Sequence, residues 1–110
     1  MCKWKTYYSG GDGYVVQCAD CQYVQLGFGT AMLTLTVDDF ATFAEMVAQR
    51  WADHVPMGTD KKCVVLPTPV PFYKVLLTES ELQDLERMLQ LADNEMRAES
   101  LLELFRGQEG

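Results

Sequence analysis

Apolar and polar residues alternate along the first third of the chain, as is typical of β-strands with one buried face. Residues 2–8 and 14–18 are rich in β-prone residues and are separated by the glycine-rich turn sequence of residues 9–13. Apolar and polar residues also alternate over residues 22–28. The alternation changes phase after Gly29, and residues 31–35 are predicted to form the next strand. The pattern therefore predicts a hairpin followed by two more strands.

A spacing of three to four residues replaces the alternation after residue 36 and predicts a first helix. We expect this helix to begin near Val37, with Thr36 as N-cap and Asp39 three residues later, and to end before Pro56. The apolar positions of this helix form one stripe: Phe40, Phe43, Ala44, Val47, Trp51 and Val55.

Two more strands are predicted at residues 61–66 and 72–77, on either side of three prolines that do not suit a sheet interior. A second helix then begins at Glu79, with Thr78 as N-cap and Glu81 completing a capping box. Its apolar stripe consists of Leu82, Leu85, Leu89, Ala92 and Met96.

The apolar stripe of the second helix changes phase towards the C-terminus. The later apolar residues lie on a different line of the helix: Ala98, Leu101, Leu102 and Phe105. Either the helix bends near Asp93 and Asn94, or its last turns pack on a partner. Unbroken from residue 79 to 105, it would be ~40 Å long, more than a body of this size needs. A second copy of the chain is the economical partner, so we expect a homodimer.

Residues 32–40 align without gaps to residues 74–82, so the two strand-to-helix junctions are expected to be alike. The chain is predicted to be α+β, with a largely antiparallel sheet of about six strands and its helices packed on one face. It would be built as a hairpin plus two strand–strand–helix units. We expect one domain over residues 1–92 and an acidic helical C-terminal extension over residues 93–110.

The 110 residues carry nine Lys and Arg against sixteen Asp and Glu, a net charge of −7. Residues 1–78 hold a net charge of −1 and residues 79–110 hold −6. The acidic helix is either a solvated face or a docking surface for a basic protein partner. The chain lacks the basic face of a nucleic-acid binder, an apolar run that could span a membrane, and a secretory signal. We therefore expect a small soluble cytoplasmic domain.

Four cysteines in a reducing compartment favour metal or thiol chemistry over disulfides. Cys18 and Cys21 have the spacing with which two thiolates from one turn bind one zinc ion. If residues 2–8 pair with residues 14–18 so that Trp4 faces Cys18, Cys2 lies opposite Asp20, close to this turn. The fourth ligand would be Cys63 or His54, and the sequence does not decide between them.

Three interpretations of these cysteines compete. They can be buried thiols without metal, a structural zinc site of Cys2, Cys18, Cys21 and either Cys63 or His54, or the redox pair of a thiol-dependent oxidoreductase using Cys18 and Cys21. His54 is more readily explained by the end of the first helix than by catalysis. No other catalytic motif is present, so a structural or protein-interaction role is favoured over an enzyme.

Three short segments together resemble a known family. They are Tyr14-Val-Val-Gln-Cys-Ala-Asp-Cys21, then Gln25-Leu-Gly-Phe-Gly-Thr30 with Met32-Leu33, and Thr36-Val-Asp-Asp-Phe40. This set resembles a family of small uncharacterised bacterial proteins, mainly from Bacteroidetes, over roughly residues 1–90. The resemblance implies a cytoplasmic domain of unknown function and assigns no catalytic residue, and the acidic tail after Asp93 lies outside it.

Overall fold

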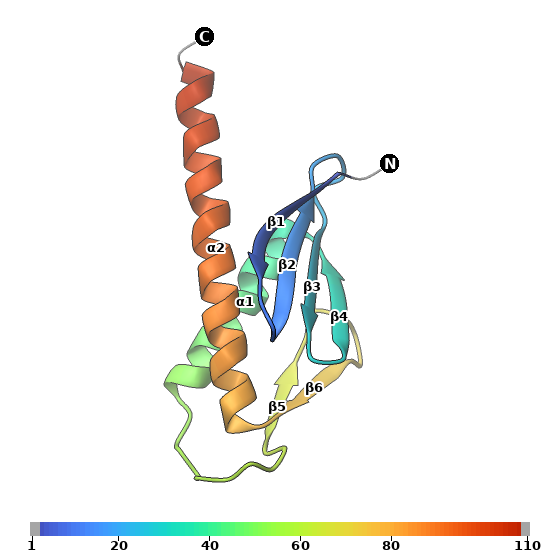
Figure 1. Cartoon of the computed structure of the whole chain (residues 1–110), viewed down its shortest axis with the longest axis vertical. Coiled ribbons are helices and arrows are strands. Elements are labelled where there is room, and N and C mark those ends of the chain that lie inside the picture. Colours follow the sequence, from blue (N-terminus) through green and yellow to red (C-terminus); the bar gives the residue numbers. More distant parts are fainter. Residues whose placement is uncertain (1–2, 109–110) are drawn as a thin grey trace.

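The computed structural model describes residues 3–108, which form an α+β fold of six strands and two helices (Figure 1). In chain order the elements are β1 (Trp4–Ser9), β2 (Gly13–Cys18), β3 (Val24–Phe28), β4 (Ala31–Leu35), α1 (Val37–Ala52), β5 (Val64–Pro67), β6 (Lys74–Leu77) and α2 (Glu79–Gln108). The predicted class and the number of strands are therefore confirmed.

The described strands form two sheets, so the prediction of a single sheet of about six strands is wrong. Strands β1 to β4 pair in sequence order as an antiparallel sheet, and β5 pairs only with β6. The chain passes through α1 before it enters β5, and β5 and β6 span only four residues each. Alternation in a sequence indicates which face of a strand is buried, but it does not indicate which strands become neighbours.

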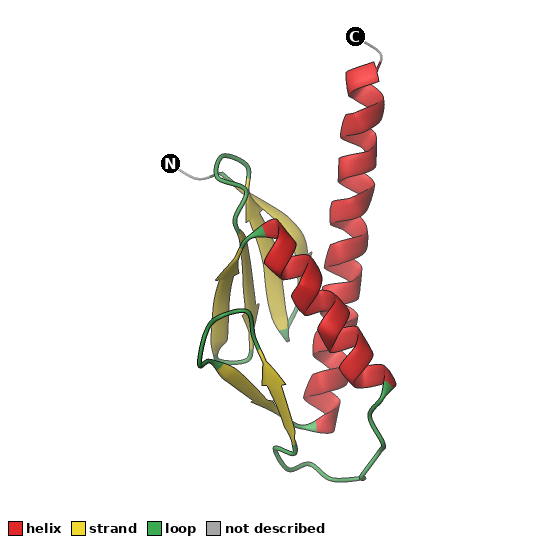
Figure 2. Cartoon of the chain, turned by 180° about the vertical axis from the view of Figure 1, so that it is seen from behind, coloured by secondary structure: helices red, strands yellow, loops and turns green. Residues whose placement is uncertain are grey.

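One buried core joins the inner face of the four-stranded sheet to both helices. Val15 pairs with Leu26, and Leu26 pairs with Leu33, which forms a buried row across three strands. Phe40 from α1 and Met88 from α2 belong to the same core. Figure 2 shows both helices beside the same face of this sheet.

Both helices begin as the sequence predicts. The Thr36 hydroxyl accepts the Asp39 N–H at 3.1 Å. At α2, the Thr78 hydroxyl accepts the Glu81 N–H at 3.1 Å, and the Glu81 carboxylate accepts the Thr78 N–H at 2.9 Å. These bonds satisfy N–H groups that would otherwise have no helical partner.

Replacing Thr78 with alanine is expected to destabilise the protein by about 1 kcal/mol, because it removes the acceptor of the Glu81 N–H. Urea unfolding followed by circular dichroism measures the change. Ser80, an exposed residue in the same turn, provides the control: Ser80→Ala should change stability by less than about 0.5 kcal/mol. Equal losses in both variants would contradict the capping role.

Helix α1 ends at Ala52, one turn earlier than its apolar pattern suggests. Val55, expected on the buried stripe, lies beyond the helix and is 75% exposed. The Asp53 N–H bonds to the Gln49 carbonyl and the His54 N–H to the Trp51 carbonyl, which closes the helix before Val55. Val55 is therefore not part of the core, although it is apolar.

Helix α2 is continuous from Glu79 to Gln108 and shows no bend at Asp93 or Asn94. Its 30 residues correspond to ~45 Å of helix. Figure 1 shows its C-terminal part rising beyond the sheet, and the molecule measures 54 × 28 × 26 Å. None of the described helices combines the length and apolarity that a membrane crossing requires.

Candidate functional site

The turn between β2 and β3 carries Cys18 and Cys21. Cys18 ends β2 and is fully buried, whereas Cys21 is exposed. The Cys21 N–H donates to the Cys18 sulfur at 3.4 Å. The backbone of Cys21 is therefore in direct contact with the buried Cys18 sulfur.

The backbone of this turn has one unusual residue directly after the cysteine pair. Gln22 has φ of 68°, a left-handed conformation that costs about 1–2 kcal/mol for a residue with a side chain. Its side-chain amide donates to the Ala19 carbonyl at 2.9 Å, and Gln17 donates to the Gln22 carbonyl at 3.1 Å. The turn is therefore held in a defined shape by bonds within the protein.

Strand β1 brings the N-terminal segment to the cysteine turn. Trp4 pairs with Cys18, as predicted, and the Ala19 N–H donates to the Lys3 carbonyl at 2.8 Å. A bulge between Thr6 and Tyr8 shifts the rest of the register, so Tyr8 faces Val15. Cys2, and its predicted position opposite Asp20, lie outside the described residues.

The structure does not bring Cys63 or His54 to this turn. The turn lies at the end of the sheet where α1 begins, whereas both of these residues follow α1, whose 16 residues span ~24 Å (Figure 1). Cys63 directly precedes β5 and is partly buried. Among residues 3–108, no three His, Cys, Asp or Glu side chains are grouped so that they could hold a metal ion.

His54 instead binds Glu79, a contact that the sequence analysis missed. The His54 Nε2 atom lies 2.6 Å from the Glu79 carboxylate, which also accepts the N–H groups of Met57 at 2.8 Å and Thr59 at 3.2 Å. The bonds from Met57, His54 and Thr59 lower the pKa of Glu79 to about 2. This cluster ties the loop after α1 to the start of α2, and no local spacing could have indicated a contact across 25 residues.

The C-terminal half of α2 carries a line of exposed residues that is apolar except for one asparagine, and one of its members, Leu101, also lines a cleft between this helix and the start of α1. We call this line the outer stripe, and it consists of Leu91, Asn94, Ala98, Leu101 and Phe105. These residues alternate spacings of three and four, the a and d spacing of paired helices. Leu91 is 48% exposed, Leu101 57% and Phe105 64%. Leu102 and Leu104 flank the stripe and are also exposed.

The acidic residues on this half of α2 are partly neutralised within the protein. Lys5 of β1 lies 2.7 Å from the Glu99 carboxylate, and Arg97 lies 3.0 Å from Asp93. The hydrogen bond from Lys5 lowers the pKa of Glu99. The negative charge that the sequence places on this helix is therefore weaker as a docking feature than a simple count suggests.

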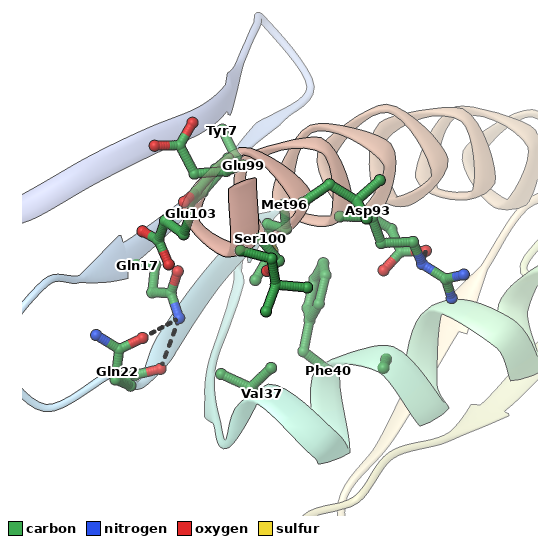
Figure 3. A pocket seen from close by; sticks show the side chains of 14 residues that line it. Tyr7, Gln17, Gln22, Val37, Phe40, Asp93, Met96, Glu99, Ser100 and Glu103 are labelled. Carbon is green, nitrogen blue, oxygen red and sulfur yellow. Dashed lines mark hydrogen bonds and ion pairs between the residues drawn. The ribbon is translucent and has the colours of Figure 1, made fainter. Parts of the chain in front are cut away.

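A cleft of about 510 Å³ lies between the start of α1 and the C-terminal half of α2 (Figure 3). Val37 and Phe40 line it from α1, and Met96 and Ser100 line it from α2. Burial raises the pKa of Tyr7, which also lines the cleft. Its described lining contains no histidine or cysteine, and it has the mixed apolar and acidic character of a surface groove.

The model of a family of unknown function, DUF6686, matches residues 1–105. The match continues past residue 90, where the sequence resemblance was expected to end, and so includes most of α2. No curated protein and no solved structure matches the chain.

Proposed function

Because the chain belongs to DUF6686, a family of unknown function, its role has to be inferred from its own surfaces, and we propose that it is a protein-interaction domain that forms a homodimer. The observation that carries this proposal is the outer stripe of α2. Leu101 and Phe105 are more than half exposed on a helix that extends beyond the body of the protein. Contiguous exposed apolar residues of this kind mark interaction surfaces.

The outer stripe suits a second copy of the same chain. Its a and d spacing is self-complementary, so two α2 helices related by a two-fold axis bury the same residues against each other. Arg97 pairs with Asp93, and Lys5 pairs with Glu99, so two of the acids on this half of α2 are already neutralised within the protein. This partial neutralisation favours an apolar self-interface. A basic partner at the acidic helix remains a prediction from the sequence.

Sedimentation equilibrium tests the proposal. We expect the wild-type protein to be a dimer and Leu101→Glu to be a monomer with unchanged helix content, because each protomer would bury a carboxylate in the apolar interface. Met57→Glu adds the same charge at a residue that is 65% exposed in a distant loop, and it should remain dimeric. Salt should strengthen the wild-type dimer, since it screens repulsion between two chains of charge −7. A monomeric wild type at high concentration, or a dimeric Leu101→Glu, would refute the proposal.

A second candidate function is structural zinc binding at the cysteine turn. It is favoured by the hydrogen bond from the Cys21 N–H to the Cys18 sulfur. The metal would connect the start of β1 to the turn between β2 and β3. Its binding free energy would stabilise the folded state. Metal analysis of protein purified without chelator should find about one equivalent, and less than ~0.1 equivalent would refute this candidate.

The thiol-dependent oxidoreductase remains a prediction from the spacing of Cys18 and Cys21 alone. A lowered thiol pKa in such enzymes commonly comes from a helix N-terminus. The turn that carries these cysteines connects β2 to β3, and no helix begins within it. We therefore give preference to metal binding for this turn.

A further inference from the structure

We propose that the two α2 helices of the dimer pair in parallel and in register, so that Asn94 of one protomer hydrogen-bonds to Asn94 of the other. This inference rests on the proposed homodimer and specifies how the second copy docks. Two helices related by a two-fold axis can run parallel or antiparallel, and the apolar residues of the outer stripe suit either direction. The one polar residue of the stripe distinguishes between the two.

Asn94 lies within the outer stripe, between Leu91 and Ala98. Its side chain is exposed, and its Oδ1 atom accepts a hydrogen bond from Gln90 at 3.3 Å, one turn earlier on the same helix. This distance is longer than is usual for an N–H···O bond, so a partner across an interface can displace it. Asn94 is not part of the buried core of the protein.

An asparagine at this position is unfavourable both for the helix and for an apolar interface. Asparagine is a poorer helix former than leucine or alanine. An amide buried without hydrogen-bond partners also costs free energy. In paired helices, a single asparagine in the apolar seam lowers stability but specifies how the helices align. Asn94 therefore indicates one defined alignment of the two copies.

The two directions of pairing give Asn94 different neighbours. In a parallel, in-register pair each residue of the stripe faces its own counterpart, so the two amides meet and each can donate to the other. An antiparallel pair matches a positions with d positions, which places Asn94 opposite Ala98 or Phe105 of the other helix. Neither of these side chains can hydrogen-bond to an amide. Antiparallel pairing would thus bury Asn94 without a partner, and parallel pairing would satisfy it.

Parallel pairing determines how the dimer presents its surfaces. The C-terminal half of α2 rises beyond the sheet (Figure 1), so the two projecting halves would lie along each other with both C-termini at one end. The axes of packed helices are about 8–10 Å apart, which places the two bodies side by side. Both copies of the cleft between α1 and α2 then lie at the same level along the pair. The dimer would offer two equivalent sites to one bivalent partner.

Disulfide formation in the full-length protein tests the direction of pairing. A parallel pair brings the two copies of residue 91 together, whereas an antiparallel pair separates them by at least ten residues of helix, ~15 Å. A disulfide requires Cβ atoms about 3.5–4.5 Å apart. We therefore expect oxidised Leu91→Cys to run mainly as a covalent dimer on a non-reducing gel, with peptide mapping locating the bond at residue 91.

Two controls accompany this experiment. Ser100→Cys places a thiol at an exposed position on the cleft side of the same helix, so it should form no disulfide at residue 100. Wild-type protein oxidised in parallel accounts for the native cysteines. Sedimentation under reducing conditions checks that Leu91→Cys still forms a dimer.

Sedimentation equilibrium of Asn94→Leu provides a second measurement. The variant replaces the amide pair with an apolar contact, so its dimer should bind at least about tenfold more tightly than the wild-type dimer. In this background the Leu91→Cys cross-link should decrease, because Asn94 no longer selects the parallel direction. Gln83→Leu adds the same side chain at an exposed position outside the outer stripe, and it should change neither the affinity nor the cross-link.

The possible failures are distinguishable. A monomeric wild type would overturn the proposed homodimer and this inference together. A dimeric wild type whose Leu91→Cys variant forms no more disulfide than Ser100→Cys would leave the homodimer standing and overturn parallel pairing. An Asn94→Leu dimer with unchanged affinity and unchanged cross-linking would place Asn94 outside the interface, and it would also overturn the inference.

Discussion

Replacing Gly13 with alanine is expected to destabilise the fold by about 3 kcal/mol, at the upper end of the cost of overpacking. A Cβ atom on Gly13 would lie 2.1 Å from the Gly27 carbonyl oxygen and 3.1 Å from the Met88 sulfur. Gly13 pairs with Phe28 in the β2–β3 ladder, so the backbone cannot move away without breaking strand pairing. Urea unfolding at neutral pH measures the loss.

Gly11 in the neighbouring turn is the control for this substitution. A Cβ on Gly11 would meet no atom within 4 Å. Gly11→Ala should therefore change stability by less than about 0.5 kcal/mol. If the two variants were equally stable, the close approach of β2, β3 and α2 at Gly13 would be contradicted. Met88 belongs to α2, so this contact also fixes the position of the helix that carries the proposed dimer interface.

Features set by neighbouring residues were predictable from the sequence. The caps at Thr36 and Thr78 depend on bonds between residues three positions apart, and the structure contains both. The buried stripes of α1 and α2 depend on helical periodicity, and Phe40, Phe43, Leu82 and Leu85 are all in the core. Local chemistry determines these features, whatever the topology around them.

Features that depend on distant partners were not predictable in the same way. The described strands form two sheets, with α1 between β4 and β5 in the chain, and strand β1, which carries the bulge near Tyr7, contacts both β2 and α2. The phase change in α2 was visible in the sequence, but two explanations remained. The continuous helix excludes the bend and leaves Leu91, Leu101 and Phe105 of the outer stripe exposed.

The candidate cysteine site likewise combines features that neighbouring residues determine with features that depend on distant parts of the chain. The pair of Cys18 and Cys21 and the approach of the N-terminal strand follow from short-range spacing and hairpin register. The fourth position was left open between Cys63 and His54, because sequence separation alone does not place either of them. The fold places both at the other end of α1, where His54 meets Glu79.

Acid is expected to weaken the protein through Glu79. The pKa of this carboxyl is lowered to about 2 in the folded state, chiefly by the Met57 N–H and then by His54 and Thr59. An unfolded glutamate titrates near ~4.3, so the folded state binds fewer protons at this residue. The stabilisation by Glu79 is therefore complete above about pH 5 and is lost as the pH falls towards 2.

Glu79→Gln should remove this contribution at every pH. The variant is expected to be less stable than wild type at pH 7, because an amide cannot accept three hydrogen bonds as a carboxylate does, and its NH₂ group faces other donors. The difference from wild type should shrink between pH 5 and pH 2, as the wild-type carboxylate is protonated. Glu45→Gln, on the exposed side of α1, removes the same charge and serves as the control. The urea concentration at the unfolding midpoint, measured for wild type and both variants at pH 7 and pH 3, tests this prediction. Equal stability of the two variants at pH 7 would show that Glu79 does not anchor the loop to α2.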